Sequence, residues 1–334
     1  MKHFVQNFIA PVYHLTIKED LGRGLKIDEN VYITNNDEVK RSFISDPLKH
    51  NIGALETVSL ENCNVFFYST IETNSEKLIE DTILRHRTIL LNFIYKCEGF
   101  LTKLWIVKDN ACTIDKGFLE VFEVLPMDRM KTFFTTSNYI GMVNTLSGGE
   151  IKETEYSKKE IENALHIFSS FRFRDFEETF NEDDLSSKYN EENRVGLSLS
   201  FLSEIRPQHN LGIKISNFCS LFESLFSTSS NELVHKLSER IAYFLEHRPE
   251  KRLETYRKIK ELYTVRSLIV HGAGINKKRH TKLAGYSEQA DDITRRFLHK
   301  ILRSRELLNT FTKHENKDLE DYLNLMVFGK RLKK

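Results

Sequence analysis

The spacing of apolar residues changes near residue 194, and this change constrains the fold of the 334-residue chain more than any other feature. Before that point, apolar and β-branched residues come mainly in short runs bounded by Asn, Asp and Gly, which is typical of β-strands. After it, glycine and proline become sparse and apolar residues recur every three to four positions, which is typical of amphipathic helices. We therefore expect an α+β domain over residues 1–190, followed by an all-α helical bundle over residues 191–334.

The first 190 residues contain six strand-like runs and one long helical pattern. The helical pattern extends from Ser75, an N-cap candidate, to Gly99, which is expected to end the helix. A capping box from Ser157 to Glu160 predicts the start of a second helix. The acidic, turn-rich stretch 177–193 marks the expected domain boundary. The predicted strands cover residues 12–17, 31–34, 64–69, 101–107, 118–124 and 131–136.

Charge is distributed unevenly, although the net charge of the chain is only +1. Residues 266–334 contain 16 Lys and Arg against 8 Asp and Glu, whereas residues 1–265 contain 33 against 40. A basic region beside an acidic remainder is typical of a polyanion-binding edge, and a solvated helix face is the alternative interpretation. The residues that would form such an edge are Lys277, Lys278, Arg279, Lys282, Arg295, Arg296, Arg303 and Arg305.

Missing motifs argue against several classes of enzyme. The string LSGGE, from Leu146 to Glu150, copies a signature of ATP-binding-cassette ATPases, but the chain has no GxxxxGK[ST] loop to hold the phosphates. We interpret it as a turn. The chain also lacks HExxH, any other recognisable pair of metal ligands and a GxSxG nucleophile elbow. We therefore expect neither a metal nor a cofactor.

The cysteines and the apolar runs bear on the compartment. The four cysteines form no CxxC pair, and we expect reduced, buried thiols. No apolar run reaches the roughly 18 residues that a membrane-spanning helix needs, and the first residues do not resemble a secretory leader. A cytoplasmic protein without membrane contact is expected. The cysteines are Cys63, Cys97, Cys112 and Cys219.

The sharpest local pattern is LYTVRSLIVHG, from Leu262 to Gly272. It places Arg266 and His271, with four residues between them, at the end of an apolar helix that Gly272 or Gly274 would cap. Positions five apart on a helix differ by about 140° in azimuth, so the two side chains converge only if the helix end deforms or if a second subunit supplies the opposing pair. Taken alone, the pair also fits a surface arginine and a histidine favourably placed at a helix C-terminus.

Three segments together resemble a known family. They are NFCSLFESLF from Asn217 to Phe226, the helix from Glu232 to Leu245 that contains Arg240, and the block from Leu262 to Gly272. In this order they resemble the ApeA-like branch of the HEPN superfamily, over roughly residues 194–311. The resemblance implies a helical domain that forms a homodimer and brings two Arg-x4-His motifs into one cleft.

The same resemblance implies a function. Many HEPN proteins of this kind are metal-independent ribonucleases that act as toxins or in anti-phage defence by abortive infection, and transfer RNA is a frequent substrate. Residues 1–190 resemble no family, and we expect them to sense a phage or cellular trigger or to restrain the nuclease. The alternatives are a HEPN dimer that binds RNA or a nucleotide without cutting, and an adaptor whose basic tail docks an acidic partner.

Roles for the motif residues follow from resemblance and chemistry together. His271 suits the base that takes a proton from the 2′-OH, and Arg266 suits the cation that stabilises charge on the phosphate. Ser267, which matches the ApeA-like pattern, is expected to orient groups by hydrogen bonding. Tyr263 and Arg240 are expected to support the site. Glu223 could pair with Arg266, could pair with Arg240, or could be a surface carboxylate. The basic residues Lys277, Lys278, Arg279 and Lys282, which follow His271 in sequence, are expected to contact RNA phosphates.

Overall fold

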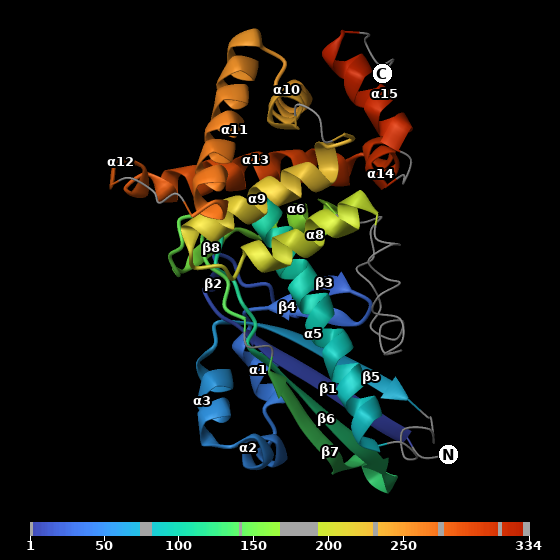
Figure 1. The fold of residues 1–334 in the computed structure, drawn as a ribbon. Helices are drawn as coiled ribbons and strands as arrows, with labels where there is room; N and C mark the ends of the chain where they lie inside the picture. The colour runs from blue at the N-terminus through green and yellow to red at the C-terminus, as the bar shows by residue number, and fades with distance from the viewer. Residues whose placement is uncertain are drawn as a thin grey trace. The chain divides into compact units, whose positions relative to one another are not determined.

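The computed structural model describes residues 3–73, 82–139, 142–167, 193–229, 233–272, 277–312 and 316–329 (Figure 1). An antiparallel sheet region comes first in the chain and a helical region follows, which confirms the expected order of an α+β part and a helical part. The chain divides into two compact units. The first contains Met1–Trp105, Asn110–Asn144 and Lys152–Asn181, and the second contains Ile106–Asp109, Thr145–Ile151 and Glu182–Lys334.

A six-stranded sheet organises the first unit. Its strand order is β3-β4-β5-β1-β6-β7, and every neighbouring pair is antiparallel. A separate parallel pair joins β2 (Leu15–Ile17) to β8 (Thr154–Tyr156). The strands of the large sheet are β1 (His3–Val12), β3 (Leu25–Asp28), β4 (Val31–Thr34), β5 (Val65–Thr73), β6 (Lys116–Leu125) and β7 (Arg129–Tyr139).

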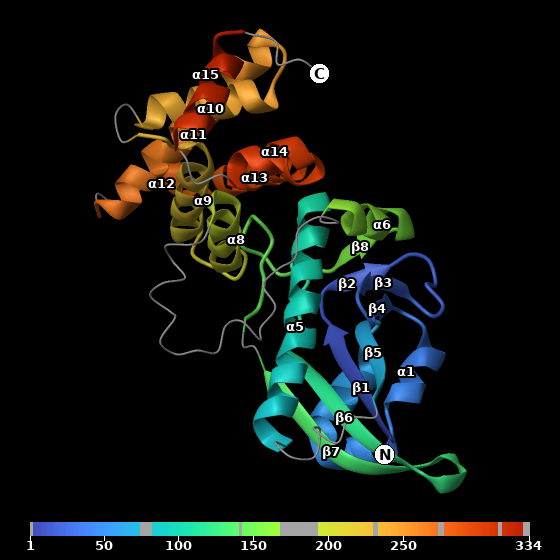
Figure 2. The same ribbon diagram turned by 90° about the vertical axis from the view of Figure 1, so that its right-hand side faces the viewer.

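Helices cover both faces of this sheet, because consecutive apolar residues in β1 point to opposite sides. The ring of Phe8 stacks on Phe93 of α5 (Thr82–Val107) with the centroids 4.8 Å apart. Its neighbour Ile9 lies in a buried cluster with Phe43 and Leu60 on the other face. That face is covered by α1 (Asp37–Phe43), α2 (Asp46–Ile52) and α3 (Ala54–Asn62). Figure 2 shows α5 and α1 on opposite sides of the strands.

Two sequence predictions in the first unit are wrong. Residues 101–107 form the end of α5 rather than a strand, and α5 passes through Gly99 instead of ending there. Leu101, Leu104 and Trp105 are buried and continue the apolar stripe of this helix, so burial offsets the cost of about 1 kcal/mol for a glycine inside a helix. The expected N-cap Ser75 lies outside the described residues. The helices α1 to α3 and the strand β1 up to Val12 were not predicted.

The capping box at Ser157 is confirmed. The backbone N–H of Ser157 donates to the Glu160 carboxylate at 2.8 Å, and the N–H of Glu160 donates to the Ser157 hydroxyl at 3.3 Å. These reciprocal bonds begin α6 (Lys158–Ile167). Most of the acidic stretch 177–193, which we interpreted as a domain boundary, lies outside the described residues.

Eight helices make up the described part of the second unit after residue 193. Aromatic rings form its core, and the centroid of Phe226 lies 5.4 Å from the centroids of Phe244, Phe297 and Phe311. The helices are α8 (Arg194–Ile205), α9 (Leu211–Phe226), α10 (Leu233–Leu245), α11 (Pro249–Val270), α12 (Lys277–His280), α13 (Leu283–Arg303), α14 (Arg305–Thr312) and α15 (Asn316–Val327).

The string from Leu146 to Glu150 forms a turn of the second unit, as expected. The N–H of Leu146 donates to the Glu150 carbonyl at 2.7 Å, and Gly149 adopts a φ of 88°. Lys214 of α9, which is 2% exposed, donates from its ammonium to the Thr145 hydroxyl at 2.7 Å and to the Leu146 carbonyl at 2.8 Å. A buried lysine therefore holds this turn to the helices.

Two further expectations concern cysteines and membranes. The four cysteines are free and buried, as the spacing predicted. Among the described residues, no helix has both the length and the apolar composition that a bilayer crossing requires.

Candidate functional site

The helix α11 carries the Arg-x4-His motif at its C-terminal end. Pro249 occupies its first turn, where its missing N–H costs no hydrogen bond. His271 is the C-cap residue, and Gly272 follows with a φ of 64°, a left-handed conformation that glycine adopts without strain. Of the two glycines that could end the helix, Gly272 does so, and the prediction that His271 lies in or just beyond the last turn is confirmed.

Arg266 belongs to a partly buried cluster between α11 and α9. Its Nη1 atom lies 3.4 Å from Oε1 of Glu223, and its guanidinium carbon lies 5.7 Å from the centre of the Tyr263 ring. The Tyr263 hydroxyl donates to the Cys219 carbonyl at 3.1 Å. Burial, together with the neighbouring Cys219 and Glu223, raises the pKa of Tyr263, so this hydroxyl stays protonated. Of the three alternatives for Glu223, the structure shows the pair with Arg266.

His271 and Ser267 lie on a different side of the helix from Arg266. Both are exposed, and they are four positions apart, so they share one face. The N–H of His271 donates to the Ser267 carbonyl at 3.1 Å, so the α-helical hydrogen-bond pattern continues to His271 without deformation. In the part of the chain that the structure describes, no hydrogen bond or ion pair joins Arg266 to His271. One chain therefore does not bring the two motif side chains together.

Arg240 makes its contacts with residues outside this cluster. It is 4% exposed, and its Nη1 atom donates to the Phe226 carbonyl at 2.8 Å and to the Thr228 hydroxyl at 3.0 Å. Its Nη2 atom lies 3.6 Å from Oε1 of Glu320. Arg240, a residue of α10, therefore connects α10 to the end of α9 and to α15. None of these contacts is with Arg266 or His271, and the supporting role expected for Arg240 stays a prediction.

The basic segment after the motif is partly described. Lys277 and Lys282 are exposed, whereas Arg279 is half-buried and its positive charge acts on the Tyr286 hydroxyl. That hydroxyl donates to Oε1 of Glu261 in α11 at 2.5 Å, which connects α13 to α11. The side chain of Lys278 and residues 273–276 lie outside the described part.

Other basic residues of the tail are already paired. Arg295 donates to Asp291 at 2.6 Å, and Arg296 lies 2.6 Å from Glu246. The solvated-face interpretation therefore fits part of the tail. Arg303 and Arg305 are exposed, as are Lys277 and Lys282 near α12, and the polyanion-binding interpretation is left to these residues. Within the described ranges, no group of three or more His, Cys, Asp or Glu side chains could hold a metal ion.

Comparisons with known proteins add nothing to this geometry. No family model, no curated protein and no solved structure matches the chain. The resemblance to the HEPN superfamily therefore stands on the motif residues themselves.

One buried cluster was missed by sequence reasoning. Asp109 accepts hydrogen bonds from the Ser147 hydroxyl at 2.6 Å and from the Ser147 N–H at 3.0 Å. Asp291 is 2% exposed, and burial together with the charge of Asp109 raises its pKa to about 7. Burial lowers the pKa of Lys214 to about 8. The only signal in the sequence was a lysine placed between Leu211 and Ile215 on an apolar helix face.

Proposed function

We propose that the chain is a metal-independent endoribonuclease of the HEPN type, in which a homodimer joins two Arg-x4-His motifs in one cleft. One observation carries the proposal: Glu223 and Tyr263 hold Arg266 in place, while His271 at the end of the same helix is open to solvent. Because the two motif residues face different sides of α11, a second chain would complete the pair that one chain leaves apart.

The chemistry follows from the groups present. The imidazole of His271 takes the proton of a ribose 2′-OH, and the 2′-oxygen attacks the adjacent phosphorus. The bond from phosphorus to the 5′-oxygen breaks, and that oxygen takes a proton from water, which leaves a 2′,3′-cyclic phosphate and a 5′-OH. Glu223 engages only part of the Arg266 guanidinium, which carries five N–H donors, so donors are left to stabilise the negative charge on the phosphate.

The remaining parts of the chain have secondary roles in this proposal. The exposed Lys277 and Lys282 contact RNA phosphates. The sheet-containing first unit holds none of the candidate residues, and we assign it to sensing a phage or cellular trigger. Such an enzyme would act in the cytoplasm as a toxin or in abortive infection, with RNA, transfer RNA included, as its substrate.

The test is a search for new 5′-OH ends. Total RNA is incubated in EDTA with the wild-type protein, with His271→Ala or with Arg266→Ala, and RNA carrying a 5′-OH is ligated and sequenced. New ends are expected with wild type only. His209→Ala, which removes another exposed histidine of the second unit, is the control and should cut as wild type does. Full activity of His271→Ala would overturn the proposal.

A second candidate is a HEPN dimer that binds RNA without cutting it. The observation that favours it is the ion pair between Glu223 and Arg266, because a guanidinium that a carboxylate already neutralises is a weaker electrophilic catalyst. Dimers that retard labelled RNA in a gel yet leave it whole under every condition would support this candidate over the nuclease.

A further inference from the structure

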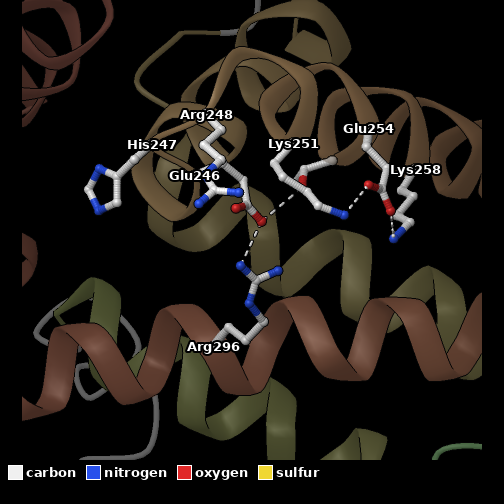
Figure 3. Close-up of a pocket in the computed structure, with 8 residues that line it drawn as sticks. Glu246, His247, Arg248, Lys251, Glu254, Lys258 and Arg296 are labelled. Atoms are coloured by element: carbon white, nitrogen blue, oxygen red, sulfur yellow. Dashed lines mark hydrogen bonds and ion pairs between the residues drawn. The ribbon is translucent and has the colours of Figure 1, made fainter.

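A hollow in the second unit collects basic side chains that the proposed nuclease chemistry does not use. It lies between the connection from α10 to α11, the first half of α11, and α13, with a volume of about 450 Å³ (Figure 3). Four of its side chains are permanent cations and two are carboxylates. The lining residues are Glu246, His247, Arg248, Lys251, Glu254, Thr255, Lys258 and Arg296.

Both carboxylates in this hollow already have partners. Glu254 accepts hydrogen bonds from Lys251 at 2.8 Å and from Lys258 at 2.7 Å, and these bonds lower the pKa of Glu254 to about 2. Glu246 lies 2.6 Å from Nη2 of Arg296 and accepts the Thr255 hydroxyl at 3.3 Å. Two negative charges therefore face four positive charges, so the hollow has an excess of positive charge.

Arg248 is the cation that no carboxylate neutralises. It is exposed, and among the described residues its guanidinium makes no hydrogen bond or ion pair. The hydrogen bond and the charge of Glu254 raise the pKa of Lys251, while the charge of Arg248 acts in the opposite direction, so Arg248 and Lys251 are two like charges that act on each other. An anion placed between them would relieve this repulsion. It would also accept hydrogen bonds from the guanidinium of Arg248, which carries five N–H donors.

A second hollow, of about 380 Å³, shares a lining residue with the first. Arg296 lines both, and Leu245 of the second hollow directly precedes Glu246 of the first. Ile106, Val107 and Leu245 give the second hollow an apolar side. Burial, with the nearby Arg303, lowers the pKa of His299, so its flat imidazole is neutral at neutral pH. Arg295, Arg296 and Lys300 complete the lining. Arg295 pairs with Asp291, and Lys300 donates to the Phe244 carbonyl, so the apolar side and the neutral ring are the part of this hollow that suits a planar heterocycle.

We propose that the two hollows together bind a nucleoside phosphate. The phosphates contact Arg248, Lys251, Lys258 and Arg296, and the base lies against Leu245, Val107 and His299. Arginine forks recognise phosphate oxygens through paired hydrogen bonds, and an apolar wall beside them gives the base a place out of water.

This site is separate from the Arg-x4-His motif and goes beyond the proposed nuclease. Lys258 and His271 are 13 positions apart on α11, which corresponds to about 20 Å along the axis and about 220° around it. A nucleotide in these hollows is therefore not the RNA from which His271 of the same chain would take a proton. Its binding can be measured whether or not the chain cuts RNA.

The experiment is isothermal titration calorimetry of the full chain at low salt, with ATP, inorganic tripolyphosphate and adenosine as the probes. ATP is expected to bind saturably and more tightly than tripolyphosphate, because only ATP fills both hollows. Arg248→Ser is expected to raise the Kd for ATP about tenfold, the effect of one charge-assisted hydrogen bond. Arg248 occupies the N-cap position of α11, but its side chain makes no capping hydrogen bond. Serine is a better N-cap residue than arginine, so this variant should fold at least as well as wild type.

Two controls sharpen the result. Arg257→Gln removes an exposed positive charge from the same helix outside the hollows and should change the Kd less than about twofold. His299→Ala should weaken ATP several-fold and leave tripolyphosphate unchanged, with circular dichroism confirming the fold. Three results would overturn the proposal. The first is the absence of saturable ATP binding, and the second is an equal change of the Kd for ATP in Arg248→Ser and Arg257→Gln. The third is that ATP and tripolyphosphate bind with equal affinity in both wild type and His299→Ala.

Discussion

The carboxylate of Glu223 in α9 lies 3.4 Å from the guanidinium of Arg266 in α11, and its Oε1 atom is shielded from solvent. The hydroxyl of Tyr263 anchors the same region by donating to the Cys219 carbonyl of α9. The direction in which Arg266 faces is therefore determined by α9, a helix some 40 positions earlier in the chain. Any role of Arg266 in chemistry depends on this contact.

Replacing Glu223 should impair RNA cleavage without unfolding the protein. Glu223→Gln keeps the shape of the side chain but loses the charge that orients Arg266, and we expect the cleavage rate to fall about tenfold. The rate is measured on labelled RNA, and urea unfolding checks the fold. Glu204→Gln, a change at an exposed carboxylate of α8, should leave the rate unchanged. Cleavage by Glu223→Gln at the wild-type rate would show that the pair has no part in the chemistry.

Arg240 should matter for stability rather than for activity. Arg240→Met removes the two hydrogen bonds to Phe226 and Thr228 at the end of α9 and leaves a buried carbonyl unpaired. We expect a loss of about 2–4 kcal/mol in the free energy of unfolding, measured in urea. Arg257→Met at an exposed position should cost less than about 0.5 kcal/mol. RNA cleavage well below the unfolding transition should be the same in Arg240→Met and wild type, and a selective loss of cleavage would contradict this assignment.

Features determined by neighbours in sequence were predictable. The capping box at Ser157 and the helix end at Gly272 each depend on a few adjacent residues. The capping box occurs where expected, and the helix ends at one of the two glycines that the sequence offered. The change from a sheet to helices was also visible, because helices and strands bury apolar residues with different periods.

Features determined by distant contacts were not predictable. Residues 101–107 look like a strand by composition, but they lie in α5, which packs on the sheet through residues such as Phe100 and Phe93. The partner of Glu223 was undecided because no local pattern tells which helix faces it. The pairing of Lys214 with Thr145 joins residues 69 positions apart, which no spacing rule anticipates.

The buried Asp291 should make stability depend on pH in an unusual direction. Burial and the charge of Asp109 raise the pKa of Asp291 to about 7, above the usual 3.8, while Arg295 and Lys214 act to lower it. Between these two pH values the folded state binds more protons than the unfolded state, so this residue makes stability fall as pH rises from about 4 to 7.

Asp291→Asn tests this directly. The variant cannot ionise, but its amide oxygen can still accept from Nε of Arg295. As pH rises from about 4 to 7, the unfolding free energy of wild type should fall relative to that of the variant, by an amount on the order of a few kcal/mol. Urea unfolding at several pH values measures it, with Asp292→Asn at the adjacent exposed position as the control. A difference that stays constant with pH would mean that Asp291 is ionised throughout.

The basic segment at α12 should bind RNA through phosphate contacts alone. Lys277 is exposed and Arg279 is half-buried beside Tyr286, and both follow the motif closely in sequence. Replacing Lys277, Lys278 and Arg279 with serine should weaken RNA binding and reduce the slope of log K against log salt, by up to about 0.7 for each charge removed. Binding is measured by fluorescence anisotropy in a His271→Ala background, so that the RNA stays whole.

A matched control removes the same charge from elsewhere in the chain. Lys26, Lys131 and Lys159 are exposed residues of the first unit, and their triple replacement with serine lowers the net charge equally. Because the contacts with RNA phosphates are assigned to the segment at α12, this control should leave the slope close to that of the parent protein. Cleavage positions, mapped in the active background, should not change in either triple variant, since phosphate contacts carry no base information. If the two triple variants show the same slope, the segment at α12 lies outside the RNA-binding surface, and the charge asymmetry between residues 1–265 and 266–334 has another origin.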